Sequence, residues 1–181
     1  MNKNKELPLR IGVGIILLNK QNNIFVGKRK DNPKNFWQMP QGGVDENENF
    51  LDAAKRELKE ETGIKSVQFL KEFDHWLEYN LPKNLLGKIW KGKYRGQKQK
   101  WFIMKFIGTN DEINVNTKNP EFIDWKWIKT SELPEVAVDF KADVYEKIRK
   151  NCVFAFFHHF KLKNQVFLEK MSKNALLNFL G

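Results

Sequence analysis

Residues 42–64 read GGVDENENFLDAAKRELKEETGI. Apolar residues recur at helical spacing from about Asn49, with Leu51 and Leu58 among them, which predicts an amphipathic helix. Gly63 is of a residue type that often ends a helix. The stretch therefore predicts a polar, glycine-led loop that runs into a helix. Within it, nine positions form one spaced pattern: Gly42, Glu48, Arg56, Glu57, Leu58, Glu60, Glu61, Gly63 and Ile64.

Three glutamates of this helix, Glu57, Glu60 and Glu61, stand at i, i+3 and i+4, so their carboxylates share one face. Like charges at this spacing cost a few tenths of a kcal/mol, unless oxygen-binding cations lie between them. The face therefore predicts a site for Mg²⁺ or Mn²⁺, which can neutralise phosphate oxygens and activate a water for hydrolysis of a phosphoanhydride. The alternative is a solvated surface, which is what most charge runs on helices form. We favour the metal site because the glutamates belong to the larger pattern.

Neighbouring residues can fix the loop to the helix. Glu48 and Arg56 are expected to form an ion pair. A lone surface ion pair adds little stability, so we expect this pair to orient the loop. Gly42 and Gly43 lack side chains, which lets a backbone carbonyl approach the metal ions. We therefore expect the loop and the helix to build one site.

The composition indicates one folded domain outside the membrane-protein and disulfide-rich classes. The chain has 181 residues, of which 41% are hydrophobic, enough for a substantial core. Its single cysteine, Cys152, cannot form an internal disulfide, and its apolar runs fall short of the roughly 20 residues that span a bilayer. No signal-peptide pattern opens the chain. We expect a cytoplasmic protein without membrane insertion.

The positive charge is concentrated away from the acidic helix. The formal net charge is +10, and the segment 81–101 contains seven Lys or Arg residues and no Asp or Glu. Trp90, Tyr94 and Trp101 lie among these cations, a combination that suits a polyanion whose bases can stack. A solvated basic loop is the alternative.

The remaining sequence predicts alternating strands and helices. The expected strands cover residues 10–18, 24–29, one or two segments within 67–79, 101–108 and 122–128, and the expected helices are the one described above and 140–149. Trp125 and Trp127 should share one face of their strand. A basic loop is expected from residue 81 to about 99. Residues 1–150 should form one domain of the α/β class, a mixed sheet between helices, and residues 151–181 an apolar and basic, helical extension that covers an apolar surface or contacts another protein.

The spaced pattern resembles the box of the Nudix hydrolases, which cleave nucleoside diphosphates linked to another moiety. Five further stretches resemble the bacterial RNA pyrophosphohydrolases of that superfamily, which remove phosphates from the 5′ end of RNA. These stretches are WQMPQGG at 37–43, WLEYNLPK at 76–83, GQKQKWF at 96–102, PEF with WKW at 120–127, and FKADVY at 140–145. The resemblance covers most of residues 10–150 and implies an α/β/α sandwich. The lysine-rich residues 85–96 depart from it.

The resemblance also implies roles for individual residues. Those implied to hold Mg²⁺ or Mn²⁺ are Gly42, Glu57, Glu60, Glu61 and Glu121. Those implied to act in catalysis are Arg56, Glu57, Glu60 and Glu61, with Glu57 as the first candidate for an essential base or metal ligand. Those implied to contact the RNA phosphates or first nucleotides are Arg10, Arg29, Tyr79, Lys83, Gln97, Lys98, Val138 and Phe140. Glu48 and Gly63 are implied to be structural. Tyr79 and Phe140 could instead be core residues, and Glu121 a surface acid.

Three functions follow from these observations. The first is hydrolysis at the 5′ end of triphosphorylated or diphosphorylated RNA, which leaves a monophosphate and promotes mRNA decay. The second is cleavage of dinucleoside polyphosphates, which also present a phosphoanhydride chain beside a base. The third is a non-catalytic Nudix-fold module that binds RNA. The presence of all four carboxylates argues against the third.

Overall fold

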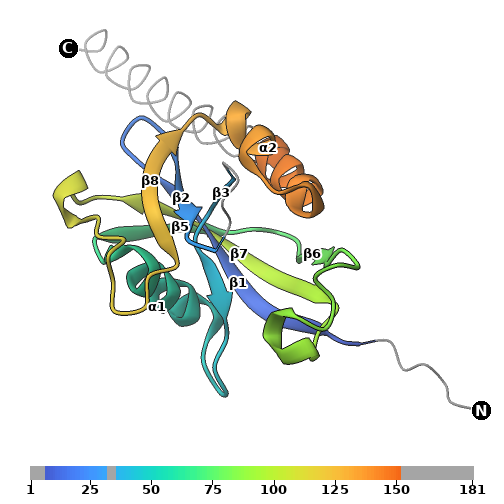
Figure 1. The fold of residues 1–181 in the computed structure, drawn as a ribbon. Coiled ribbons are helices and arrows are strands. Elements are labelled where there is room, and N and C mark those ends of the chain that lie inside the picture. The colour runs from blue at the N-terminus through green and yellow to red at the C-terminus, as the bar shows by residue number, and fades with distance from the viewer. Residues whose placement is uncertain (1–6, 32–35, 152–181) are drawn as a thin grey trace, which may run out of the picture.

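The computed structural model describes residues 7–31 and 36–151, so the expected C-terminal extension lies outside the described residues from 152 onward. In this part, eight strands form one sheet in the order β3-β2-β1-β7-β5, with β4 beside β1, β6 beside β7 and β8 beside β2 (Figure 1). The strands are β1 (Leu9–Leu18), β2 (Ile24–Arg29), β3 (Trp37–Gln38), β4 (Gln41–Gly43), β5 (Val67–Glu72), β6 (Leu77–Asn80), β7 (Gly96–Phe106) and β8 (Phe122–Ile128). The β1–β7 pair is parallel and the other pairs are antiparallel, so the sheet is mixed.

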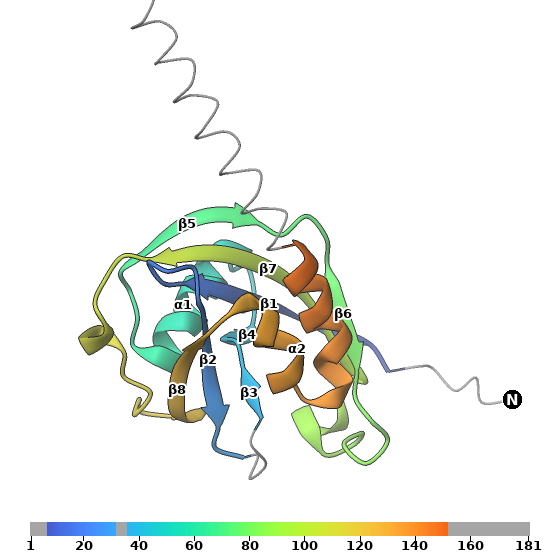
Figure 2. The same cartoon turned by 90° about the horizontal axis from the view of Figure 1, so that it is seen from above.

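Helices cover both faces of the sheet. The helix α1 (Phe50–Thr62) lies on one face, while the short α2 (Leu133–Val136) and a helix at 142–151 lie on the other (Figures 1 and 2). Short 3₁₀ turns occur at Ile89–Gly92, Asn110–Glu112, Thr130–Glu132 and Asp139–Lys141. The predicted mixed sheet between helices is confirmed.

The strand β1 shows why both faces need cover. Val13, Ile15 and Leu17 point into the core under α1, whereas Ile16 and Leu18 point into the core under the helix at 142–151. Successive side chains of a strand point to opposite faces, so a strand covered on both sides is apolar at every position. The continuous apolar run of β1 therefore reflects its central place in the sheet.

The helix α1 begins and ends where the sequence indicates. The side chain of Asn49 accepts a hydrogen bond from the backbone N–H of Leu51 at 2.8 Å, which satisfies a donor that the first helical turn leaves free. Gly63 adopts a left-handed φ of 75° and donates its N–H to the carbonyl of Lys59. Both termini are thus fixed by local chemistry.

Two predicted boundaries were wrong. The strand β7 begins at Gly96 and not at Trp101, because residues 96–100 pair with β1 on one side and, in part, with β6 on the other. The predicted helix at 140–149 begins as the 3₁₀ turn Asp139–Lys141 and continues at 142–151. Two other expectations were right: the segment 67–79 contains β5 and most of β6, which ends at Asn80, and Trp125 and Trp127 both contact the ring of Phe25.

None of the helices in residues 7–31 and 36–151 has the length and apolar character needed to cross a bilayer.

We predict that Asn49→Ala lowers the free energy of unfolding by about 1 kcal/mol, because the first turn of α1 loses its side-chain acceptor. Urea denaturation measures the change. Asn49→Ser keeps an acceptor and should remain close to the parent protein. Equal destabilisation by serine and alanine would contradict the capping role.

Candidate active site

A pocket of about 350 Å³ lies where β4 is bordered by β1 and α1, and it extends to the 3₁₀ turn Asp139–Lys141. Gly42 and Gly43 of β4 and Gln97 of β7 contribute to its walls. Eleven residues singled out from the sequence line it: Arg10, Arg29, Gly42, Gly43, Glu57, Tyr79, Trp90, Gln97, Glu121, Val138 and Phe140. The fold therefore brings together residues that are up to 130 positions apart in the chain.

Arg56 joins the loop to α1. Its Nε and Nη2 each donate to a different oxygen of Glu48 at 2.8 Å, and Nη2 also donates to the carbonyl of Gly43 at 3.0 Å. The hydrogen bond from Arg56 lowers the pKa of Glu48 to about 2. The expected ion pair is present, and a two-point contact of this kind fixes direction as well as distance.

Glu57 lies directly against the glycine loop. Its Oε1 accepts from the backbone N–H of Gly43 at 3.0 Å and from Nη1 of Arg56 at 2.9 Å. A β-carbon at Gly42 would collide with the Glu57 carboxylate, so this approach requires glycine. Burial is the largest influence on Glu57 and raises its pKa, although Arg56 opposes the shift.

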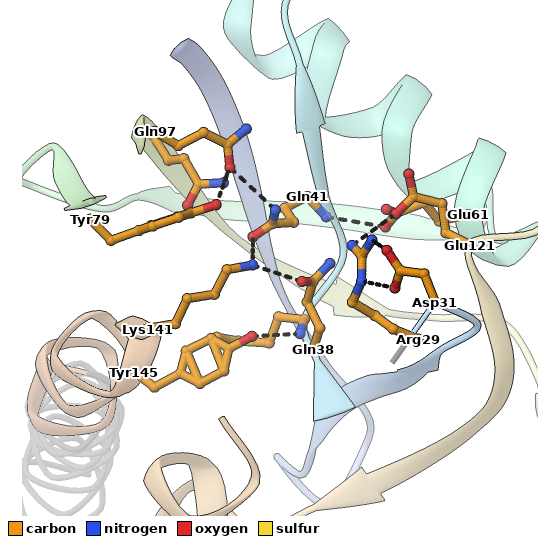
Figure 3. Close-up of polar contacts among 12 residues, drawn as sticks. Arg29, Asp31, Gln38, Gln41, Glu61, Tyr79, Gln97, Glu121, Lys141 and Tyr145 are labelled. Carbon is orange, nitrogen blue, oxygen red and sulfur yellow. Dashed lines mark hydrogen bonds and ion pairs between the residues drawn. The ribbon is translucent and has the colours of Figure 1, made fainter. Parts of the chain in front are cut away.

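Glu61 is the most buried acid of the site, with 3% of its surface exposed. Its Oε2 accepts from the backbone N–H of Gln41 at 3.1 Å, but its buried Oε1 has no partner among the described residues. Burial first, and then the negative charges of Glu121 and Glu57, raise the pKa of Glu61 well above its usual value. Figure 3 shows Glu61 beside Glu121.

These carboxylates fit a hard cation. A buried carboxylate oxygen without a partner, close to two further acids, is unfavourable unless a positive charge joins it. In the described part of the chain, however, no three acidic, His or Cys side chains form a ready-made metal cluster. Arginines engage the acids instead: Arg29 contacts Glu121 at 3.3 Å, and Arg56 contacts Glu57 at 2.9 Å and Glu60 at 3.5 Å.

A hydrogen-bonded network forms the opposite side of the pocket (Figure 3). The Tyr79 hydroxyl and the Gln41 amide both donate to Oε1 of Gln97, at 2.6 and 3.3 Å. The amide nitrogens of Gln97 and Gln38 are buried and have no partner in the described residues. Two donors thus remain available beside the pocket, which suits a ligand rich in acceptor oxygens.

Lys141 is a site residue that the sequence reasoning missed. Its Nζ donates to Oε1 of Gln38 at 2.7 Å and to Oε1 of Gln41 at 3.0 Å, and it lies 5.2 Å from the centre of the Tyr79 ring. Burial, and then the charge of Arg29, lower the pKa of Lys141 to about 7. The 3₁₀ turn directs this lysine inward. Its place within the FKADVY stretch at 140–145 was the one available signal.

Asp31 was also missed. Its two oxygens accept from Nε and Nη2 of Arg29 at 2.7 and 2.6 Å, which leaves Nη1 of Arg29 directed to Glu121. The Arg29 guanidinium holds the pKa of Asp31 below its usual range. Asp31 lies in the turn two residues after Arg29, the last residue of β2, so the short spacing between them was the local signal.

Four residues expected at the site or in RNA stacking lie elsewhere, one of them Glu60, whose side chain is 58% exposed and outside the pocket lining. Lys98 follows Gln97 on β7, so it faces the α1 side of the sheet, 5.8 Å from the centre of the Trp76 ring. Lys83 is exposed and outside the pocket lining. Trp101 is 1% exposed and packs in the core, so the idea that it stacks on bases was wrong.

The geometry and the fold define a class of protein. The NUDIX domain model matches residues 8–148, and the chain belongs to the Nudix family. A solved structure of a C. elegans Ap4A hydrolase is similar with a TM-score of 0.58 and 21% identity, covering 80% of this chain and 97% of that one. At this identity the likeness concerns the fold alone.

Relatives with higher sequence identity indicate a group within the Nudix family. The RNA pyrophosphohydrolase of Pelagibacter ubique is 60% identical over 151 residues, which are 83% of this chain and 96% of the relative. The RNA pyrophosphohydrolase of Cereibacter sphaeroides (strain ATCC 17029) is 49% identical over 144 residues, 78% of this chain and 89% of the relative. Within the Nudix family the chain therefore groups with proteins that carry this name.

We predict that Lys141→Met increases stability most at low pH. The folded-state pKa of about 7 lies below the ordinary 10.5, so the folded protein carries the full cost of a buried charge below about pH 7. This cost disappears as the pH rises from about 7 towards 10.5. Urea denaturation from about pH 6 to about pH 9 should show the gain of the variant shrinking with pH. A gain that does not vary with pH would contradict the burial of a titrating lysine.

Proposed function

We propose that this pocket hydrolyses the 5′-terminal phosphoanhydride of triphosphorylated or diphosphorylated RNA, leaving a 5′-monophosphate and promoting mRNA decay. The observation that carries the proposal is the division of the pocket into two halves. Glu57 and Glu121 line an acidic half, with the buried Glu61 beside them, while Arg10 and Lys141 belong to a half rich in donors. The names of the relatives at 49 and 60% identity support the choice of RNA as substrate.

Mg²⁺ or Mn²⁺ is the cofactor that we propose. The ligands would be carboxylates and a backbone carbonyl, which are the oxygen donors these ions prefer: Gly42, Glu57, Glu60, Glu61 and Glu121. Such cations, when bound, neutralise phosphate oxygens and lower the pKa of a water. Gly43 and Arg56 orient Glu57 through its Oε1, which supports its proposed role as an essential carboxylate. Whether Glu57 takes the proton or only holds metal stays open.

The donor-rich half would bind the phosphates. Arg10, Arg29 and Lys141 supply positive charge, and the unpartnered amide nitrogens of Gln97 and Gln38 supply N–H donors. Lys141 titrates near neutrality in the free protein, and a phosphate beside it would favour its charged form. Phosphate binding and protonation of this lysine would therefore support each other.

An aromatic wall next to these groups would receive a base. The rings of Tyr79 and Phe140 lie 5.6 Å apart, centre to centre, and Val138 lines the same pocket. Stacking on an aromatic ring contributes about 1 to 3 kcal/mol per base and tolerates different bases. The cytoplasm, where transcripts are made and decay, is the compartment that this proposal implies.

Dinucleoside polyphosphates remain the competing substrate, because they too present a phosphoanhydride chain with a base beside it. A non-catalytic RNA-binding module is the second competitor. The half-buried Glu57 and the buried Glu61 argue against that module, since binding alone gives no reason to accept their mutual repulsion. A protein partner of the C-terminal extension stays a prediction, because residues 152–181 are outside the described residues.

The substrate comparison is the first test. Purified protein and Mg²⁺ are incubated with triphosphorylated RNA, monophosphorylated RNA and diadenosine tetraphosphate, and initial rates of phosphate or pyrophosphate release are measured. Triphosphorylated RNA should be preferred, and Glu57→Gln should reduce its turnover at least about 100-fold without altering the melting temperature. Preference for the dinucleotide would overturn the RNA assignment. Turnover of neither substrate would favour the binding module.

Two lysines provide a matched comparison. Lys141→Met should reduce kcat/KM for triphosphorylated RNA about tenfold or more, because a charged donor to phosphate is lost within the pocket. Lys98→Met removes the same charge from the opposite face of the sheet and should act mainly through the salt dependence of binding. Similar effects of both changes would mean that the phosphates do not enter the pocket beside Lys141.

A further inference from the structure

The pocket has a second apolar wall, for which the proposed function gives no role. It is built by the segment between β6 and β7, where Leu85, Ile89 and Trp90 all line the pocket. Each is partly buried and packs against the core on this side of the sheet. Among the described residues, the Trp90 ring contacts the Tyr94 ring, whereas Tyr79 and Phe140 contact each other.

The backbone of this wall is strained. Trp90 (φ 51°, ψ 36°) and Lys91 (φ 55°, ψ 29°) are two successive residues in the left-handed region. In residues 7–31 and 36–151, the other non-glycine residues with positive φ are Asn22 and Asn47, and asparagine tolerates this conformation well. If this segment served only as a turn, glycine or asparagine at positions 90 and 91 would make it more stable. The residue types therefore point to a use for the side chains.

The strained turn directs the Trp90 ring towards the site. The guanidinium of Arg10 lies 5.7 Å from the centre of this ring, and the ring of Tyr94 packs against it edge-on at 6.3 Å. Arg10 is opposite Gln97 in the β1–β7 ladder, so Trp90 is adjacent to the donor-rich half of the pocket. An indole in this position offers a stacking surface next to groups proposed to bind phosphate.

The charges around Trp90 suit a nucleic-acid backbone. Lys88, Lys91 and Lys93 are exposed in the same segment, which contains no acid from residue 81 to residue 101. By contrast, Lys98 and Lys100 on the other face of the sheet lie close to Glu78 and Glu72, which offset their charge. Within the described segment 81–101, the cations beside Trp90 therefore have no acid in an ion pair with them.

We propose that Trp90 forms a stacking subsite for a nucleobase of an RNA nucleotide downstream of the 5′-terminal one, with the neighbouring lysines contacting the connecting phosphates. The proposal rests on RNA as the proposed substrate. One aromatic wall receives one base and the Trp90 wall receives another. A substrate with a single base gains from one wall, and an RNA of two or more unpaired nucleotides gains from both.

Trp90→Asn is the informative variant, because asparagine keeps the left-handed turn and removes the ring. Kinetics are measured with a nucleoside triphosphate, a triphosphorylated dinucleotide and a triphosphorylated RNA of about ten unpaired nucleotides. The variant should raise KM about tenfold for the two RNAs and leave KM for the nucleoside triphosphate unchanged. Trp90→Phe should restore most of the loss. Trp76→Ala, which removes a half-buried indole outside the pocket, should leave all three KM values close to the parent, and thermal melting checks folding throughout.

Binding without hydrolysis separates this proposal from the proposed function. The probe is a fluorescently labelled, 5′-monophosphorylated single-stranded RNA hexamer, measured without divalent cations. Trp90→Asn should weaken its binding about tenfold. If the parent protein hydrolyses no triphosphorylated RNA, the proposed function is wrong. Weaker binding of the hexamer by the variant would still support the subsite in that case. Unchanged binding of the hexamer, or an equal rise in KM for the nucleoside triphosphate, would overturn the subsite. Trp90 would then only hold the Arg10 side chain in place.

Discussion

The contact on which the rest of the site depends is the fork of Arg56. One guanidinium joins Glu48 of the loop, the carbonyl of Gly43 and the carboxylate of Glu57 on the helix. These groups come from β4, the loop and α1, and β4 is itself fixed on β1 by a defined register. Without Arg56, the carboxylates of Glu48 and Glu57 would each keep one backbone N–H donor but lose the cation between them. Arg56 thus joins the loop to α1 and also reduces the repulsion between the neighbouring carboxylates.

The acids of the pocket and the cations that we propose bind the substrate restrain each other. The pocket lining contains three cationic residues, Arg10, Arg29 and Lys141, and three acids, Asp31, Glu57 and Glu121. When all six groups are ionised, their charges cancel, although the chain carries +10. A balanced pocket attracts a bare polyanion only weakly, and it accepts phosphate best when cations arrive at the acids as well. Phosphate and metal ions should consequently bind cooperatively, since each removes the charge that the other meets.

The parts of the site that could be predicted from sequence are those fixed locally. The helix α1 and its ends at Asn49 and Gly63 follow from spacing and capping over a few residues, and the helix period alone places Glu57 beside Glu61. Lys141 could not be found this way, because its inward direction depends on a 3₁₀ turn packed against Gln38, about 100 positions away. The start of β7 was missed for a similar reason. Gln97 and Lys98 have no apolar pattern, and only pairing with β1 makes them a strand.

Strand parity and loop strain together explain how this fold distributes its lysines. On β7, Gln97 enters the pocket and Lys98 must therefore leave it, so a regular strand cannot present a continuous basic surface to one ligand. The segment between β6 and β7 is not a strand, so its side chains need not alternate between two faces. Its left-handed turn places Trp90 against Arg10, while Lys88 and Lys91 stay exposed. Rigid elements hold the acids, whose positions must not vary. The proposed recognition of a flexible RNA falls to the irregular segment between β6 and β7. Its costly backbone conformation is acceptable because the RNA would bind the Trp90 side chain that this conformation exposes.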